Sequence, residues 1–185
     1  GVAMKGVIFN VVEETVRAEH GEEAWDGLLE AAGLDGAYTS LGTYPDHEMT
    51  ALVAAACAVD GTSREDMLRH LGRAGFSRLA ERNTQLMADF TDARTLLLGL
   101  NSVIHPEVRK VYPGAEVPTF DVVSGESDHL SLSYRSKRGM CHFAEGLALG
   151  AGDLFGETII VTQPICEHRG GDHCELRFTW PAANP

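Results

Sequence analysis

The sequence predicts an α+β fold, with a helical amino-terminal lobe packed on a carboxy-terminal lobe that holds an antiparallel sheet and further helices. Apolar residues recur at helical spacing through the first half of the chain and alternate at strand spacing in the second half. The 185 residues, 44% of them hydrophobic, suffice for one domain with a sizeable core. We expect this domain to cover residues 4–180, divided into lobes 4–62 and 63–180.

The helical half has clear start and stop signals. Gly21 is a stop for the first amphipathic run, and Ser63 with Asp66 resembles a capping box. The segment Gly36–Pro45 is rich in turn formers and predicts a loop. Residues 1–3 resemble a remnant of cloning, so we expect a native start at Met4. The expected helices are residues 7–20, 22–32, 48–59, a segment from residue 64, and a long helix over 86–111.

The second half alternates strands with one helix. Leu130, Leu132 and Tyr134 fall on one face of a predicted strand. Gly170–Asp172 reads as the turn of a late hairpin. The expected strands are residues 118–123, 130–134, 158–166 and 174–180, with a helix over 140–155.

Charge and composition exclude several kinds of partner. The formal net charge is −12, which disfavours nucleic acid and anionic membrane surfaces, because both require clustered Lys and Arg. No apolar run reaches the length of a membrane span, and no signal segment opens the chain. Four cysteines without such a signal predict a protein of the reducing cytoplasm, where clustered thiols bind metal or respond to oxidants.

Two features suggest a cofactor site. His105 lies near the end of the predicted long helix, where a histidine is either a simple helix-end residue or an iron ligand. Downstream, Tyr134, Ser136 and Arg138 fall on one side of an extended segment. Two hydroxyls and a guanidinium suit a carboxylate or phosphate, although a solvated strand end would also carry them.

Together, a helix-end histidine followed by Tyr-x-Ser-x-Arg resembles the H-NOX (haem nitric oxide/oxygen binding) family, in its stand-alone bacterial form. The resemblance implies haem b between the two lobes, with His105 as the proximal ligand and Tyr134, Ser136 and Arg138 on the propionates. Pro118 falls where the family places a proline that distorts the porphyrin. We expect the slot to be lined by Ile8, Val12, Leu79, Phe143 and Leu147.

The resemblance also implies which gas is bound. Family members that hold O2 use a distal tyrosine, and the matching position here is Phe143. We therefore expect nitric oxide, and also CO, to bind while O2 is excluded, unless Tyr38, Tyr44 or His142 reaches the pocket. The implied mechanism is release of His105 and movement of the lobes, which signals to a histidine kinase or a cyclic-di-nucleotide enzyme. No nucleophile with a base is evident, so no enzymatic activity is predicted.

The cysteines form a second candidate site. Cys141 opens the late helix, and an antiparallel hairpin would bring Cys166 and Cys174 together. Some H-NOX proteins bind zinc with such cysteines and a histidine, at a position occupied here by Gln163. We expect His168, or else His173, as the fourth ligand, with free thiols or a disulfide between Cys166 and Cys174 as the alternatives.

Other interpretations of the chain remain open. Cys57 is predicted to be a small buried apolar residue. The cysteines alone would also fit a haem-free small-molecule-binding module of the vinyl-reductase type, or a thiol or zinc redox sensor.

Overall fold

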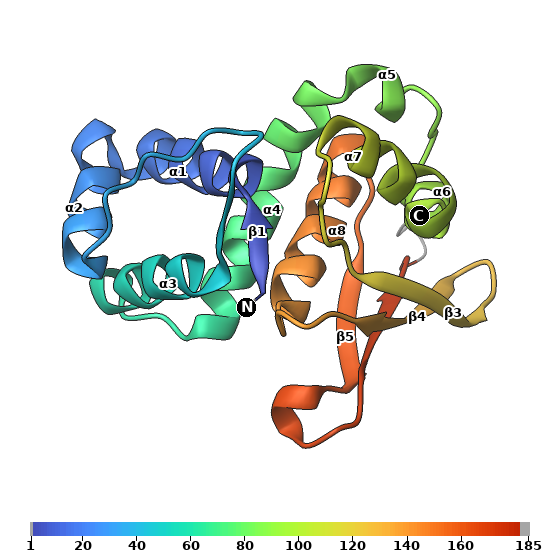
Figure 1. Cartoon of the computed structure of the whole chain (residues 1–185). Coiled ribbons are helices and arrows are strands. Elements are labelled where there is room, and N and C mark those ends of the chain that lie inside the picture. Colours follow the sequence, from blue (N-terminus) through green and yellow to red (C-terminus); the bar gives the residue numbers. More distant parts are fainter. Residues whose placement is uncertain (1, 182–185) are drawn as a thin grey trace.

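The amino-terminal lobe is built from three helices, α1 (Gly6–His20), α2 (Glu22–Ala32) and α3 (Asp46–Asp60). A computed structural model describes residues 2–181 and shows this lobe beside a larger sheet-containing lobe (Figure 1). Phe9, Trp25 and Leu52 are fully buried in the core of the helical lobe. The three helices confirm the prediction from hydrophobic periodicity. The first of them ends before Gly21, as predicted, and Gly21 has a φ of 95°.

The predicted loop over residues 36–45 contains a strand that sequence periodicity missed. Strand β1 (Ala3–Lys5) pairs with β2 (Thr43–Pro45) in antiparallel register. Both strands are only three residues long, so neither shows an alternation that a sequence pattern could reveal. Gly6 follows this ribbon, and a Cβ there would lie 1.9 Å from the carbonyl oxygen of Thr39. Only glycine permits this close approach.

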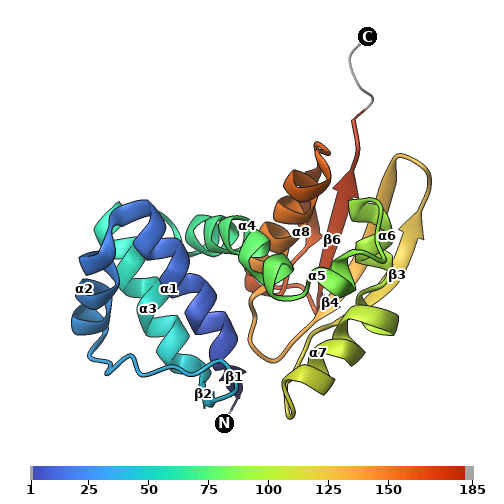
Figure 2. The same ribbon diagram turned by 90° about the horizontal axis from the view of Figure 1, so that it is seen from above.

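Helix α4 (Arg64–Arg82) runs between the two lobes, and Figure 2 shows it flanked by α1 and α8. Its amino-terminal end confirms the predicted cap, because Ser63 Oγ accepts a hydrogen bond from the backbone nitrogen of Asp66 at 3.1 Å.

The long helix predicted over residues 86–111 is wrong. The segment breaks into α5 (Thr84–Met87), α6 (Ala93–Leu98), a π-helical turn (Leu100–Ile104) and α7 (His105–Val111). Asp92 causes the first break, since its extended backbone and its carboxylate, 2.7 Å from the nitrogen of Thr95, cap a new helix. The π turn inserts before His105, so this residue begins α7 instead of ending a long helix.

The sheet confirms the α+β prediction. Its order is β3 (Thr119–Gly125), β4 (His129–Arg135), β6 (Cys174–Thr179) and β5 (Ile160–Ile165), with every neighbouring pair antiparallel. Helix α8 (Cys141–Phe155) and α6 share a core with the sheet. The late hairpin has a longer loop than predicted, because a 3-10 turn (Glu167–Arg169) precedes Gly170. Within residues 2–181, no helix is long and apolar enough to cross a membrane.

Candidate functional site

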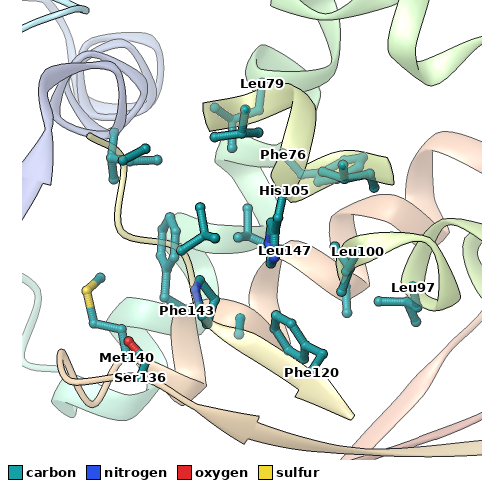
Figure 3. A pocket seen from close by; sticks show the side chains of 18 of the residues that line it. Phe76, Leu79, Leu97, Leu100, His105, Phe120, Ser136, Met140, Phe143 and Leu147 are labelled. Carbon is teal, nitrogen blue, oxygen red and sulfur yellow. The ribbon is translucent and has the colours of Figure 1, made fainter. Parts of the chain in front are cut away.

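A largely apolar cavity lies between the two lobes. Residues of α1, α4, α6, α7, α8 and the sheet line it, and His105 points into it beside Phe120 and Leu147 (Figure 3). The lining includes most of the residues that the sequence singled out, namely Ile8, Leu79, His105, Pro118, Tyr134, Ser136, Arg138, Phe143 and Leu147. Segments far apart in the sequence therefore converge on one apolar slot.

Val12 is the exception among the predicted lining residues. It lies one turn beyond Ile8 on α1 and packs into the core of the helical lobe, where it is buried. Val7 lines the cavity together with Ile8, so the cavity meets only the amino-terminal turn of α1. The prediction for Val12 is corrected for this reason. Sequence reasoning also missed Phe120 and Met140, which carry no signal beyond ordinary hydrophobicity.

His105 presents a neutral imidazole to the cavity. The side chain is buried, and burial lowers its pKa to about 4, with a smaller contribution from the positive charge of Arg109. At neutral pH the ring therefore holds a free lone pair, which is the form that binds iron. The ring of Phe120 lies 5.9 Å away, centroid to centroid, and contributes apolar packing beside it.

Tyr134, Ser136 and Arg138 meet at one edge of the cavity even though strand β4 ends at Arg135. A turn carries the last two, and the backbone nitrogen of Arg138 donates to Ser136 Oγ at 3.3 Å. Burial raises the pKa of Tyr134 to about 12, so its hydroxyl stays protonated and able to donate.

The guanidinium of Arg138 is only partly satisfied. It donates to the carbonyl oxygens of Glu116, at 2.7 Å, and of Ala3. Its Nε is buried and has no hydrogen-bond partner within the described residues. A buried charged donor without an acceptor is costly, so the site has capacity for an anion at this edge. A haem propionate has the chemistry that this donor set fits.

The cavity side of α8 lacks a hydroxyl at the position that the sequence identified. Phe143 is buried there and lines the cavity. Tyr38 and Tyr44 instead form an aromatic cluster with Phe9 in the helical lobe. The lining from other elements does contain polar groups, and of these Asn83 donates its amide to the carbonyl oxygen of Leu79 at 2.8 Å.

The three late cysteines converge in a separate buried cluster. Cys141 and Cys166 have their Sγ atoms 3.9 Å apart, Cys174 is fully buried, and all three thiols are free. Burial raises the pKa of Cys141 and of Cys174, and proximity to a second thiol adds to the effect.

His168 does not join this cluster as predicted. Its Nε2 donates to the carbonyl oxygen of Gly139 at 2.8 Å. Instead, His142 offers a ring nitrogen that lies with the Sγ atoms of Cys141 and Cys166 within 4.8 Å of one another. The sequence analysis did not identify His142 as a metal ligand. It directly follows Cys141, and zinc ligands in a pair are usually separated by two or more residues.

This fold and this cavity define a class of α+β proteins in which a buried histidine and an edge suited to an anion line one apolar cavity. The family model described as haem-NO-binding matches residues 5–163. The chain therefore belongs to the haem-NO-binding family, the H-NOX family, as the motif predicted.

Solved H-NOX structures resemble the whole chain. A mutant H-NOX protein from S. oneidensis in the Fe(II) state is 34% identical, with a TM-score of 0.91 and 98% of each chain covered. An Fe(II)NO structure from S. oneidensis is also 34% identical, with a TM-score of 0.90, covering 96% of this chain and 99% of that one. The unliganded Fe(II) protein from K. algicida is 30% identical, with a TM-score of 0.87 and coverages of 98% and 99%. No curated protein matches the chain.

Proposed function

We propose that this protein is a sensor that binds nitric oxide on haem b, excludes O2 and signals to a partner protein. The observation that carries this proposal is the buried neutral His105, in an apolar cavity whose edge holds the partly satisfied guanidinium of Arg138, with its Nε unpaired. Haem iron would supply the site at which the gas binds. His105 would hold the iron, and Tyr134, Ser136 and Arg138 would hold the propionates.

Phe143 is the basis for gas selectivity in this proposal. Bound O2 is polar and gains from a hydrogen-bond donor, whereas nitric oxide and CO need little help of this kind. Phe143 cannot donate, so the position that the resemblance identifies offers bound O2 no hydrogen bond. Under this proposal Phe143→Tyr adds a donor and allows a stable O2 complex to form in air, while Phe143→Leu does not.

The test is an absorbance spectrum of the reduced protein before and after exposure to air and then to nitric oxide. We expect a Soret band that ignores air and shifts with nitric oxide to a five-coordinate position. His105→Gly should lose haem and regain it with added imidazole. Failure to bind haem after reconstitution, or an O2 complex in the unchanged protein, would contradict the proposal.

Signalling would proceed by release of His105 and movement of lobe 4–62 against lobe 63–180. Pro118 lies on the cavity wall, where it would press on the porphyrin. A gas shifts such an equilibrium only through different affinities for the two packings. The partner would be a histidine kinase or a cyclic-di-nucleotide enzyme of the cytoplasm, and the domain itself would carry out no catalysis.

A second proposal concerns zinc at Cys141, Cys166 and Cys174. Three buried thiols with a nearby imidazole are a tetrahedral donor set for zinc. Zinc binds the thiolate form of cysteine, so a loaded site would engage the thiols that a metal-free redox sensor needs. The apolar cavity with His105 likewise favours haem over a haem-free binding module.

A further inference from the structure

Helix α8 carries a buried histidine, His142, whose two ring nitrogens are not both satisfied by hydrogen bonds. Nδ1 of His142 lies 3.1 Å from the Oε2 of Glu145 and 3.1 Å from the amide nitrogen of Gln163. A ring nitrogen either donates to the carboxylate or accepts from the amide, so one of these contacts goes unsatisfied. The other nitrogen, Nε2, is buried without a hydrogen-bond partner within the described residues.

This imbalance is costly because the site is buried. The side chain of His142 is 2% exposed and that of Glu145 is 5% exposed. Unpaired polar atoms at such depth carry a desolvation cost that no hydrogen bond offsets. A buried network that is only partly satisfied indicates that a group belonging to it is missing.

The neighbouring thiols suggest what that group is. A nitrogen of His142 and the Sγ atoms of Cys141 and Cys166 are mutually within 4.8 Å, as donors around one metal ion are. Cys174 lies outside this group of three, but its thiol interacts with those of Cys141 and Cys166, and its Sγ lies 3.5 Å from the backbone nitrogen of Glu167. Gln163, which occupies the position of the family's histidine, contacts His142 directly.

We propose that His142 is the fourth protein ligand of a zinc ion held by Cys141, Cys166 and Cys174. This inference rests on the proposed zinc site and corrects the expected role of His168. With one ring nitrogen on the metal, the other keeps its hydrogen for a carboxylate, as metal-binding histidines usually do. Glu145 and Glu65 both lie within reach, the latter with Oε1 3.7 Å from Nε2.

The same contacts connect the metal site to the helix between the lobes. Glu145 Oε2, which faces His142, also accepts from Arg69 of α4, with Nη2 at 2.8 Å and Nε at 3.0 Å. His142 is therefore joined through one carboxylate to α4, whereas His168 is bonded to the turn at Gly139. Ligation by His142 ties α4 to the metal, which ligation by a hairpin histidine would not do.

The experiment is metal binding by the full chain with reduced cysteines, in the wild type, His142→Ala and the matched control His168→Ala. Zinc content would be measured by mass spectrometry, affinity by competition with a chelator, and the donor set by the spectrum of the Co²⁺-loaded protein. We expect one zinc per chain and a tetrahedral cobalt spectrum with three thiolates and one imidazole in the wild type and in His168→Ala.

His142→Ala should weaken binding by at least the roughly 10- to 100-fold that follows loss of a ligand's hydrogen-bond partner. The double variant His142→Ala, Gln163→His should regain affinity, because it restores a histidine at the family position. This rescue separates ligation from a folding defect, and circular dichroism of each variant checks folding directly.

The outcomes distinguish the assignment of His142 from the proposal that the three cysteines bind zinc. A wild type that binds neither zinc nor cobalt would overturn both. A wild type that binds zinc, with unchanged affinity in His142→Ala or a loss in His168→Ala, would overturn only the assignment of His142.

Discussion

The two sides of helix α4 are packed in different ways. Toward α8, glycines bring backbone against backbone: a Cβ on Gly146 would lie 2.1 Å from the carbonyl oxygen of Arg69, and one on Gly72 2.3 Å from that of Phe143. Toward α1, the tightest glycine contact is with a side chain, where a Cβ on Gly75 would lie 2.6 Å from Cγ1 of Val11.

The ion pairs show this asymmetry only in part, because the α8 side also carries the half-exposed pair of Arg73 with Asp153. On the α8 side, Arg69 reaches the buried carboxylate of Glu145. On the α1 side, Arg82 pairs with Glu14, whose side chain is 43% exposed. Side chains can repack more cheaply than a backbone contact can open. The comparison teaches that α4 is packed more tightly against α8 than against α1.

Breaking the buried pair should have the largest effect. Arg69→Met leaves the Glu145 carboxylate without its cation, and breaking a buried pair costs about 3–5 kcal/mol. Because Arg69 is 34% exposed, we expect a loss toward the lower end of that range. The free energy of unfolding from urea denaturation measures it. A loss no larger than that of Arg82→Met would remove the asymmetry.

Acid should destabilise the folded protein through His105, which lies in the sheet-containing lobe. The pKa of His105 is lowered to about 4 in the folded protein, mainly by burial. Between the ordinary value near 6.5 and about 4, the unfolded chain binds the extra proton, so stability falls as the pH falls. The haem-free protein should lose on the order of 3 kcal/mol across that window. His105→Leu should flatten the profile, and an unchanged slope in this variant would contradict the assignment.

Adding a methyl group on either side tests the packing contrast directly. Gly146→Ala forces a Cβ into the backbone of α4, so we expect a loss near the upper end of the roughly 1–3 kcal/mol typical of overpacking. Gly75→Ala should lose less, because Val11 is a side chain that can yield. In α2, Gly27→Ala meets nothing within 4 Å and serves as the control. Thermal unfolding of the three variants would rank them, and equal losses would refute the contrast.

The exposed pair should have the smallest effect. Arg82→Ala removes a pair with Glu14 in which both side chains are about a third or more exposed, 30% and 43%. Such pairs contribute about 0–1 kcal/mol. The expected change in unfolding free energy is within that range and decreases further in high salt. A larger, salt-independent loss would mean that the α1 side is held as firmly as the α8 side.

Part of the fold could be predicted from local spacing. Helix α2 begins and ends at the predicted residues, and Ser63 caps α4 as its motif indicates. The strand carrying Leu130 and Leu132 buries the face that alternation selects, although the opposite face, with Ser131 and Ser133, is buried as well. These features depend on neighbours within a turn or a strand, so the sequence encodes them directly.

The break after Met87 was missed because the apolar spacing continues across it. Asp92 is of a residue type that commonly caps helices, but the sequence prediction rested on hydrophobic periodicity alone. The π turn before His105 has no local signature beyond Gly99, whose carbonyl oxygen accepts from Ile104 at 3.0 Å. Boundaries of this kind are set by how the segment packs across the cavity.

The sequence by itself determined the family, the α+β class and the identity of the cavity residues His105, Tyr134, Ser136 and Arg138 as candidates. It did so because their types and order along the chain are a recognisable pattern. Only the tertiary structure decided that Val7 replaces Val12 at the cavity and that His142 replaces His168 beside the thiols. Both outcomes depend on tertiary contacts between residues that are distant in the sequence. The spacing of residues along the chain does not specify those contacts.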